Sequence, residues 1–182
     1  AHLYHISTLA KEMKFDDYLQ ENPVLNFSIY SSLQIETIRD LGETIIEQFD
    51  KMIREPNIVD MSEGNPYGKI WLWIIGAFEI VRTMSDEKWK GSWEEDTFSR
   101  ILNYKQKLAE LRVPFAKQEK RNKKRSPFQN EPSIYGIDHK DKSYLFEARG
   151  TTYSIRMLIL EFDELIRGIS LSDINHDMRE ND

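Results

Sequence analysis

The amino-acid sequence predicts a mainly α-helical protein, an antiparallel bundle of four to five helices with one small β-hairpin near residues 133–148. Apolar residues recur three or four positions apart in most long segments, which is the period of a helix with one buried face. Only one short region has the aromatic and β-branched composition of paired strands. The chain has 182 residues, 40% of them hydrophobic. This is enough for one buried core, so we expect residues 1–182 to form a single helical domain.

Two helices are predicted in the N-terminal part of the chain. A short first helix is expected from apolar residues at helical spacing, namely Leu3, Ile6, Leu9, Ala10 and Met13. A longer helix is expected over residues 27–54, where five apolar residues lie three or four positions apart: Ile38, Leu41, Ile45, Phe49 and Met52. Gly42 within it costs roughly 1 kcal/mol relative to alanine, so we expect it to permit close packing against a neighbour.

The most apolar stretch of the chain, residues 70–78, lies within a predicted helix over residues 69–84. It is too short to span a membrane, which requires about 20 residues. Because this helix is apolar on nearly all sides, we expect it in the middle of the fold. A buried β-strand is the competing interpretation, but the segment is longer than a typical strand.

A polar link over residues 86–95 carries Trp89 and Trp93. We expect these tryptophans to cover the edge of the core, and the alternative is that they form a partner-binding surface. A further helix with an apolar stripe is predicted to end at Pro114. It leads into a predicted basic mobile loop over residues 115–132.

The last predicted helix has the clearest pattern. Its apolar residues follow the helical period without interruption: Ile155, Leu158, Ile159, Phe162, Leu165, Ile166 and Ile169. Gly168 lies where a C-terminal cap is expected. Residues 170–182 are polar and acidic, and we expect them to form a frayed tail.

The charge is unevenly distributed, although the net charge is −6. Residues 117–125 contain six basic residues and one acid, a local net charge of +5, which leaves −11 for the rest of the chain. The overall acidity argues against a dedicated DNA-binding domain, whereas the basic segment indicates an anionic partner. The candidate residues are Lys117, Lys120, Arg121, Lys123, Lys124 and Arg125. They could contact nucleic-acid phosphates or an acidic protein, or they could form a solvated helix end and loop.

A second candidate site is the run Arg149-Gly150-Thr151-Thr152 followed by Arg156. If the last helix begins near Thr152, its free N–H groups and its dipole favour a bound anion there. Gly150 would let a ligand approach the backbone, and the two arginines would supply positive charge. These features suit a phosphate, sulfate or carboxylate. The alternative is a threonine-capped helix whose arginines pair with acidic residues.

A third candidate is formed by Glu79 and Arg82, the only charges between residues 70 and 84. Their spacing places them on one helix face, where they can pair with each other. If they are buried, Glu79 could lie in a cleft as a proton acceptor or a cation ligand. The alternative is a structural ion pair or a solvent-facing strip.

Sequence features exclude several classes of site. The chain has no cysteine, which removes disulfides, thiolate catalysis and cysteine-ligated metals. Its four histidines lack metal-ligand spacing, so we predict no metal and no cofactor. Because there are no thiols and no secretory leader in the sequence, we predict a cytoplasmic location.

These observations favour a soluble helical binding or regulatory module that contacts an anionic partner through its basic segment. The expected partners are nucleic acid or an acidic protein, with a homodimer also considered and no membrane contact. The alternative is an enzyme or small-ligand sensor that holds an anion at the start of the last helix. A third hypothesis is a structural or assembly protein whose tryptophans are buried in a partner.

Overall fold

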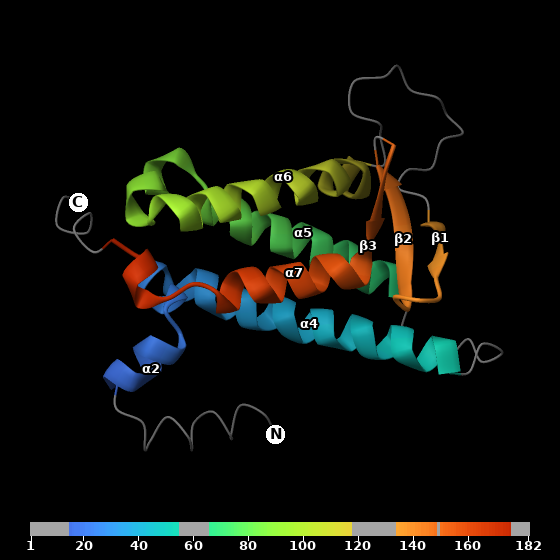
Figure 1. Ribbon diagram of the computed structural model, residues 1–182, viewed down its shortest axis with the longest axis horizontal. Helices are drawn as coiled ribbons and strands as arrows, with labels where there is room; N and C mark the ends of the chain where they lie inside the picture. Colours follow the sequence, from blue (N-terminus) through green and yellow to red (C-terminus); the bar gives the residue numbers. More distant parts are fainter. Residues whose placement is uncertain (1–14, 55–65, 118–133, 149, 176–182) are drawn as a thin grey trace.

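The computed structural model describes residues 15–54, 66–117, 134–148 and 150–175. As predicted, the protein is mainly helical with a small antiparallel sheet (Figure 1). The α-helices are α2 (Phe15–Glu21), α3 (Val24–Phe27), α4 (Ile29–Arg54), α5 (Pro66–Met84), α6 (Glu95–Lys117) and α7 (Ile155–Arg167). The strands are β1 (Ile134–Asp138), β2 (Ser143–Ala148) and β3 (Thr151–Ser154), and the 3-10 helices are η1 (Glu87–Ser92) and η2 (Leu171–Asp173). The helix predicted from Leu3 to Met13 lies outside the described residues.

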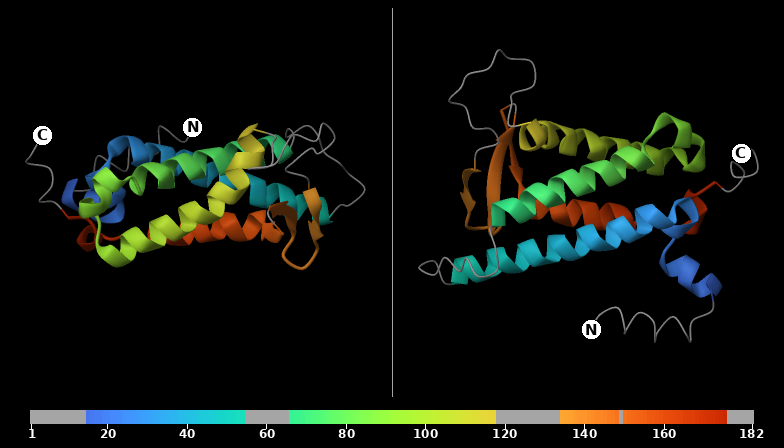
Figure 2. Two further views of the ribbon diagram at one scale, coloured as in Figure 1. Left: turned by 90° about the horizontal axis from the view of Figure 1, so that it is seen from above. Right: turned by 180° about the vertical axis from the view of Figure 1, so that it is seen from behind.

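The four longest helices run alternately in opposite directions (Figure 1). Helix α5 packs between α4 and α6, whereas α7 contacts α4, α6 and the sheet. Seen from behind in Figure 2, α4 and α5 run side by side in front of α7. The sheet covers one end of the helices, where β2 and β3 contact α7.

The core contains the apolar stripe of α7 that the sequence pattern predicts, packed against buried residues of α4, α5 and α6. The apolar stripe of α7 is buried from Ile155 to Ile166, and Ile169 just beyond the helix is buried as well. Trp73 of α5 is fully buried and meets the ring of Phe162 edge to face, with ring centroids 6.0 Å apart. Aromatic contacts of this geometry add to the free energy gained by burying both rings.

Gly42 allows α4 to approach this core closely, as the sequence predicts. A Cβ atom at Gly42 would lie 2.8 Å from Cγ2 of Ile159 and 3.1 Å from Nε1 of Trp73. Both distances are shorter than normal van der Waals contact, so a side chain at this position would require α7 or Trp73 to shift.

The expectation that residues 69–84 are surrounded by the core is only partly correct. The helix begins earlier, at Pro66, which is a favourable residue for a first helical position. The sides of α5 that face α4 and α6 are buried, but Trp71 and Leu72 are exposed.

The sheet has three antiparallel strands in the order β1-β2-β3. Strand β3 pairs with β2 from Leu145↔Ser154 to Ala148↔Thr151, so the prediction that the last helix begins near Thr152 is wrong. Helix α7 begins at Ile155, and the side chain of Ser154 caps it by accepting a hydrogen bond from the Met157 N–H at 3.3 Å. Gly150 supplies the positive φ of +79° that the tight turn between β2 and β3 requires.

Two predicted boundaries also differ from the structure. Helix α6 continues past Pro114 to Lys117, so the first residues of the predicted basic loop are helical. The predicted tail is held in place at its start, because Ile174 is buried and forms a β-bridge with Trp93. The remainder of the tail, residues 176–182, lies outside the described residues.

The tryptophans of the predicted polar link lie at the edge of the core. Trp93 is buried, and its ring centroid lies 4.6 Å from that of Phe27. Trp89 meets the same phenylalanine edge to face at 5.7 Å, while Lys88 lies over its ring. Within the described part of the chain, no helix is both long and apolar enough to cross a membrane.

Candidate functional site

Arg156, the centre of the predicted anion site, is held by contacts within the protein. One Nη group donates to Oδ1 of Asp50 at 2.7 Å, and Nε donates to the Lys142 carbonyl at 3.1 Å. The backbone N–H of Arg156 donates to Oγ of Ser143 at 2.9 Å. With its side chain only 17% exposed, Arg156 joins α4, the turn before β2 and the first turn of α7.

The other residues of that candidate site do not form an anion cradle at a helix end. Thr151 and Thr152 are exposed strand residues in β3, and Gly150 lies in the turn before them. Arg149 lies outside the described residues. Since the carboxylate of Asp50 already neutralises Arg156, the geometry agrees with the structural alternative for this arginine.

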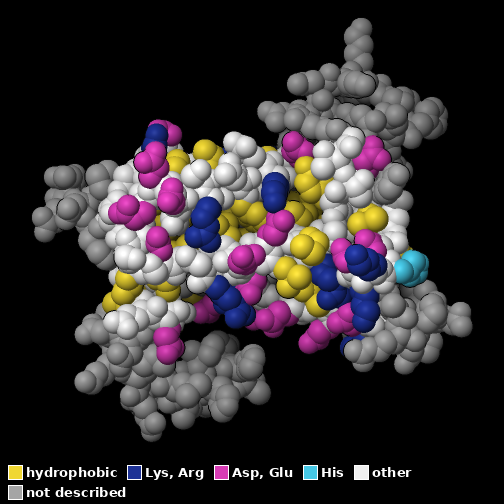
Figure 3. All heavy atoms as spheres, in the orientation of Figure 1, with side chains coloured by type: hydrophobic (Ala, Val, Ile, Leu, Met, Phe, Trp, Pro, Cys, Tyr) yellow, Lys and Arg dark blue, Asp and Glu magenta, His cyan; other side chains and the backbone are white. Residues whose placement is uncertain are grey.

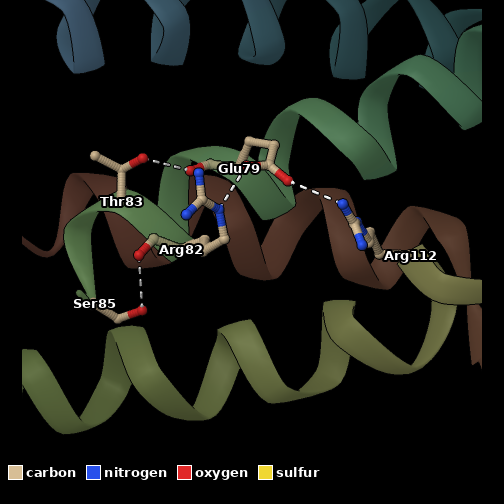
Figure 4. Close-up of polar contacts among 5 residues, drawn as sticks. All are labelled: Glu79, Arg82, Thr83, Ser85 and Arg112. Atoms are coloured by element: carbon tan, nitrogen blue, oxygen red, sulfur yellow. Dashed lines mark hydrogen bonds and ion pairs between the residues drawn. The ribbon is translucent and has the colours of Figure 1, made fainter. Parts of the chain in front are cut away.

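Glu79 and Arg82 form an ion pair, with Nε of Arg82 donating to Oε2 of Glu79 at 2.6 Å (Figure 4). A second arginine, Arg112 of α6, approaches the other carboxylate oxygen at 3.5 Å. The side chains of Glu79 and Arg82 are 39% and 52% exposed, so this charge is not buried. The cluster bridges α5 and α6 at the surface, and at this exposure it contributes little to stability.

All arginines whose side chains the structure describes are engaged within the protein. Five of them pair with carboxylates, and these are Arg39, Arg82, Arg112, Arg156 and Arg167. The sixth, Arg100, donates to the Gly168 carbonyl at 3.5 Å. Five of the six guanidinium groups are thus neutralised by carboxylates within the protein, and only the exposed Arg100 lacks a carboxylate partner among the described residues.

The predicted basic patch lies almost entirely outside the described residues. Lys117 ends α6, and its backbone is the one part of the patch that the structure describes. Lys120, Arg121, Lys123, Lys124 and Arg125 lie beyond it.

An apolar groove between α4 and α5 is a concave surface that sequence reasoning missed. The groove has a volume of about 320 Å³ and is lined by Leu33, Gln34, Thr37, Ile38, Gly76, Glu79 and Ile80. Gly76 makes the helices fit tightly at its floor, because a Cβ atom there would lie 2.3 Å from Cδ1 of Ile38. We refer to this surface as the α4–α5 groove.

An acidic stripe runs along α4 and begins next to the α4–α5 groove. It consists of Glu36, Asp40, Glu43 and Glu47, which are all exposed and make no ion pair with any described residue. Their spacing of three or four positions places them on one side of the helix. In Figure 3, acidic side chains lie along the lower edge of the molecule, where α4 runs, with basic side chains among them.

Two of the titratable groups with displaced pKa values, Tyr104 and Asp173, have structural roles. Burial raises the pKa of Tyr104 well above its usual value, with a smaller contribution from Glu161, and its hydroxyl donates to the Leu158 carbonyl at 2.6 Å. Hydrogen bonds from Ser170 lower the pKa of Asp173, which also accepts one from Thr97. In the described ranges, no three histidines, aspartates or glutamates lie together as a metal site would require.

No protein-family model, curated protein or solved structure matches this chain. Its function must therefore be inferred from the contacts and charges of its own residues.

Proposed function

We propose that this protein is a cytoplasmic helical-bundle binding module that contacts the phosphate backbone of a nucleic acid through residues 117–125. The observation that carries the proposal is the segregation of charge, +5 within this segment and −11 in the rest of the chain. A concentrated positive charge on an otherwise acidic protein directs a polyanion to one place.

The contacts of the described arginines support the same choice. Five of the six pair with carboxylates within the protein, whereas the segment contains only one acidic residue, Glu119, to offset its six cations. The segment is thus the densest run of positive charge in the sequence. Nucleic acid, with one negative charge per about 1.7 Å of duplex, presents a density of negative charge that suits such a segment.

The expected contacts are with phosphates rather than with bases. Phe115 and Phe128 flank the segment, but no aromatic residue is interleaved among its basic residues. Proteins that stack on bases place aromatic side chains between the cations. Binding is therefore expected to be insensitive to nucleotide sequence and strongly weakened by salt.

A pair of charge-matched variants tests the proposal. The segment variant replaces three basic residues with glutamine, namely Lys120, Arg121 and Lys123. The control variant replaces three lysines outside the segment with glutamine, namely Lys69, Lys105 and Lys140. None of the control lysines forms an ion pair with a described residue, so both variants lose three positive charges without breaking a described ion pair.

Fluorescence anisotropy with a labelled mixed-sequence duplex measures the affinity of the full chain. We expect the segment variant to bind about tenfold or more weakly and the control variant to bind almost as the unmodified protein does. Equal losses in the two variants would show a general charge effect and contradict the proposal. A protein that binds polyglutamate but neither DNA nor RNA would overturn it in favour of an acidic protein partner.

A further inference from the structure

The α4–α5 groove has apolar anchoring points at both of its ends. Leu33 lies at one end with its side chain 56% exposed. Leu72, one turn before Gly76 on α5, is 52% exposed and extends the apolar wall in the other direction. Exposed leucines beside a shallow aliphatic floor are typical of a surface that a partner covers.

The spacing of these anchors fits a helix lying along the groove. Leu33 of α4 and Ile80 of α5 both line the groove. Leu72 lies eight residues before Ile80 on α5, which is about 12 Å along that helix. A helix in the groove would therefore contact both leucines with residues about two turns apart. Two parallel ridges with an apolar floor are the surface into which an amphipathic helix packs.

The charge beside the groove indicates which kind of helix it would accept. The acidic stripe of α4 carries four exposed carboxylates that lack ion-pair partners among the described residues. Glu36 and Asp40 lie three residues after the groove residues Leu33 and Thr37 and are therefore their neighbours on the surface of α4. A helix bound in the groove would place one flank toward these two carboxylates. Basic residues on that flank would be attracted to it, and acidic residues would be repelled.

The same stripe argues against a second copy of this chain as the occupant. In a two-fold symmetric dimer the same surface of each copy meets the other, so two acidic stripes would lie close together. Like charges at an interface oppose association.

From these observations we propose that the α4–α5 groove binds an amphipathic helix of a protein partner. This helix carries two large aliphatic residues about two turns apart and lysine or arginine along the flank that faces α4. The inference does not depend on the basic segment, because the groove and the acidic stripe belong to α4 and α5. Each of the two proposals can fail while the other holds.

The test uses a synthetic amphipathic peptide of about 18 residues, roughly 27 Å long as a helix, with leucines two turns apart and a lysine-rich flank. A matched peptide has glutamate in place of each lysine. Anisotropy with the full chain is expected to show binding of the basic peptide that is about tenfold or more tighter than that of the acidic one. Equal affinities for the two peptides would contradict the charge argument.

Two double variants locate the site. The groove variant is Leu33→Ser with Leu72→Ser, and the control variant is Met157→Ser with Leu160→Ser, which alters comparably exposed residues on α7. Loss of two apolar contacts is expected to weaken peptide binding about tenfold or more in the groove variant only. Unchanged affinity in the groove variant would overturn the proposal. A dimer of the unmodified protein that becomes monomeric in this variant, measured by light scattering, would identify a second copy as the occupant and also overturn it.

Cross-linking gives a readout that does not depend on the stability of the groove variant. The chain has no cysteine, so a single Thr37→Cys substitution in the groove provides a unique thiol. A basic peptide with a thiol-reactive group is expected to label Thr37→Cys and not the control Met157→Cys on α7. Labelling of both positions at the same rate would show that the peptide does not select the groove.

Discussion

The close approach of α4 to the core at Gly42 gives a prediction whose magnitude follows from the structure. In Gly42→Ala, the new Cβ atom would lie 2.8 Å from Cγ2 of Ile159 and 3.1 Å from Nε1 of Trp73. Both neighbours are buried in the core, and Trp73 has no exposed surface. Neither side chain can move aside without disturbing other contacts, because the interior is closely packed.

Two opposing effects determine the free energy of unfolding of this variant. Alanine stabilises a helix interior by about 1 kcal/mol relative to glycine. Overpacking by one methyl group costs about 1–3 kcal/mol. We therefore expect Gly42→Ala to be destabilised by up to about 2 kcal/mol, which for a chain of this size lowers Tm by about 2–4 °C per kcal/mol.

Gly68→Ala is the matched control, because a Cβ atom at Gly68 in the first turn of α5 meets no atom within 4 Å. This variant is expected to be more stable than the unmodified protein by up to about 1 kcal/mol. Urea unfolding followed by circular dichroism measures both variants, and they should differ by about 1–3 kcal/mol. If Gly42→Ala were as stable as Gly68→Ala, the close packing of α4 on Trp73 and Ile159 would be refuted.

Three further predictions concern contacts that the structure defines. Ser154→Ala removes the cap of α7 and is expected to lower the free energy of unfolding by about 1 kcal/mol, whereas Thr152→Ala should lower it by less. If urea unfolding showed a larger loss for Thr152→Ala than for Ser154→Ala, the helix start would lie at Thr152. Asp50→Ala leaves the mostly buried Arg156 without its carboxylate and is expected to cost about 1–3 kcal/mol, whereas an unchanged urea midpoint would show that this ion pair contributes nothing. The lowered pKa of Asp173 means that its stabilisation is present above the unfolded-state pKa near 3.8 and is lost as the pH falls through the folded-state pKa. Asp173→Asn should abolish this part of the loss of stability at low pH. Identical dependence of unfolding free energy on pH in the variant and the unmodified protein would contradict this prediction.

The helices with one buried face were predictable because their signal is local. Every apolar residue of the α7 stripe is buried, and Gly42 makes the close contact that its position suggests. In both cases the relevant information lies within a few turns of a single helix. The burial of α5 was predicted less well, since its exposed side depends on which neighbours pack against it.

Strand β3 was missed because its residues fit two local structures. Gly150 followed by two threonines is typical of a helix start, but β-branched residues after a tight turn are equally typical of a strand. Pairing with β2 decides between them, and that pairing is a tertiary contact.

The candidate sites depended on contacts between distant segments, which spacing cannot reveal. Asp50 pairs with Arg156, and Arg112 of α6 reaches Glu79 of α5. The α4–α5 groove likewise arises only when two helices with exposed leucines lie side by side. The stretch of sequence between Leu33 and Leu72 gives no indication that they belong to one surface.

The salt dependence of nucleic-acid binding tests the proposed function most directly. If all six cations of residues 117–125 contact phosphates of a duplex, the logarithm of the binding constant should fall linearly with the logarithm of salt concentration, with a slope of about −5. Fewer contacts would give a proportionally smaller slope, and the segment variant should reduce it by about 3. A slope near zero, or the same slope with and without Lys120, Arg121 and Lys123, would contradict binding of phosphates by this segment.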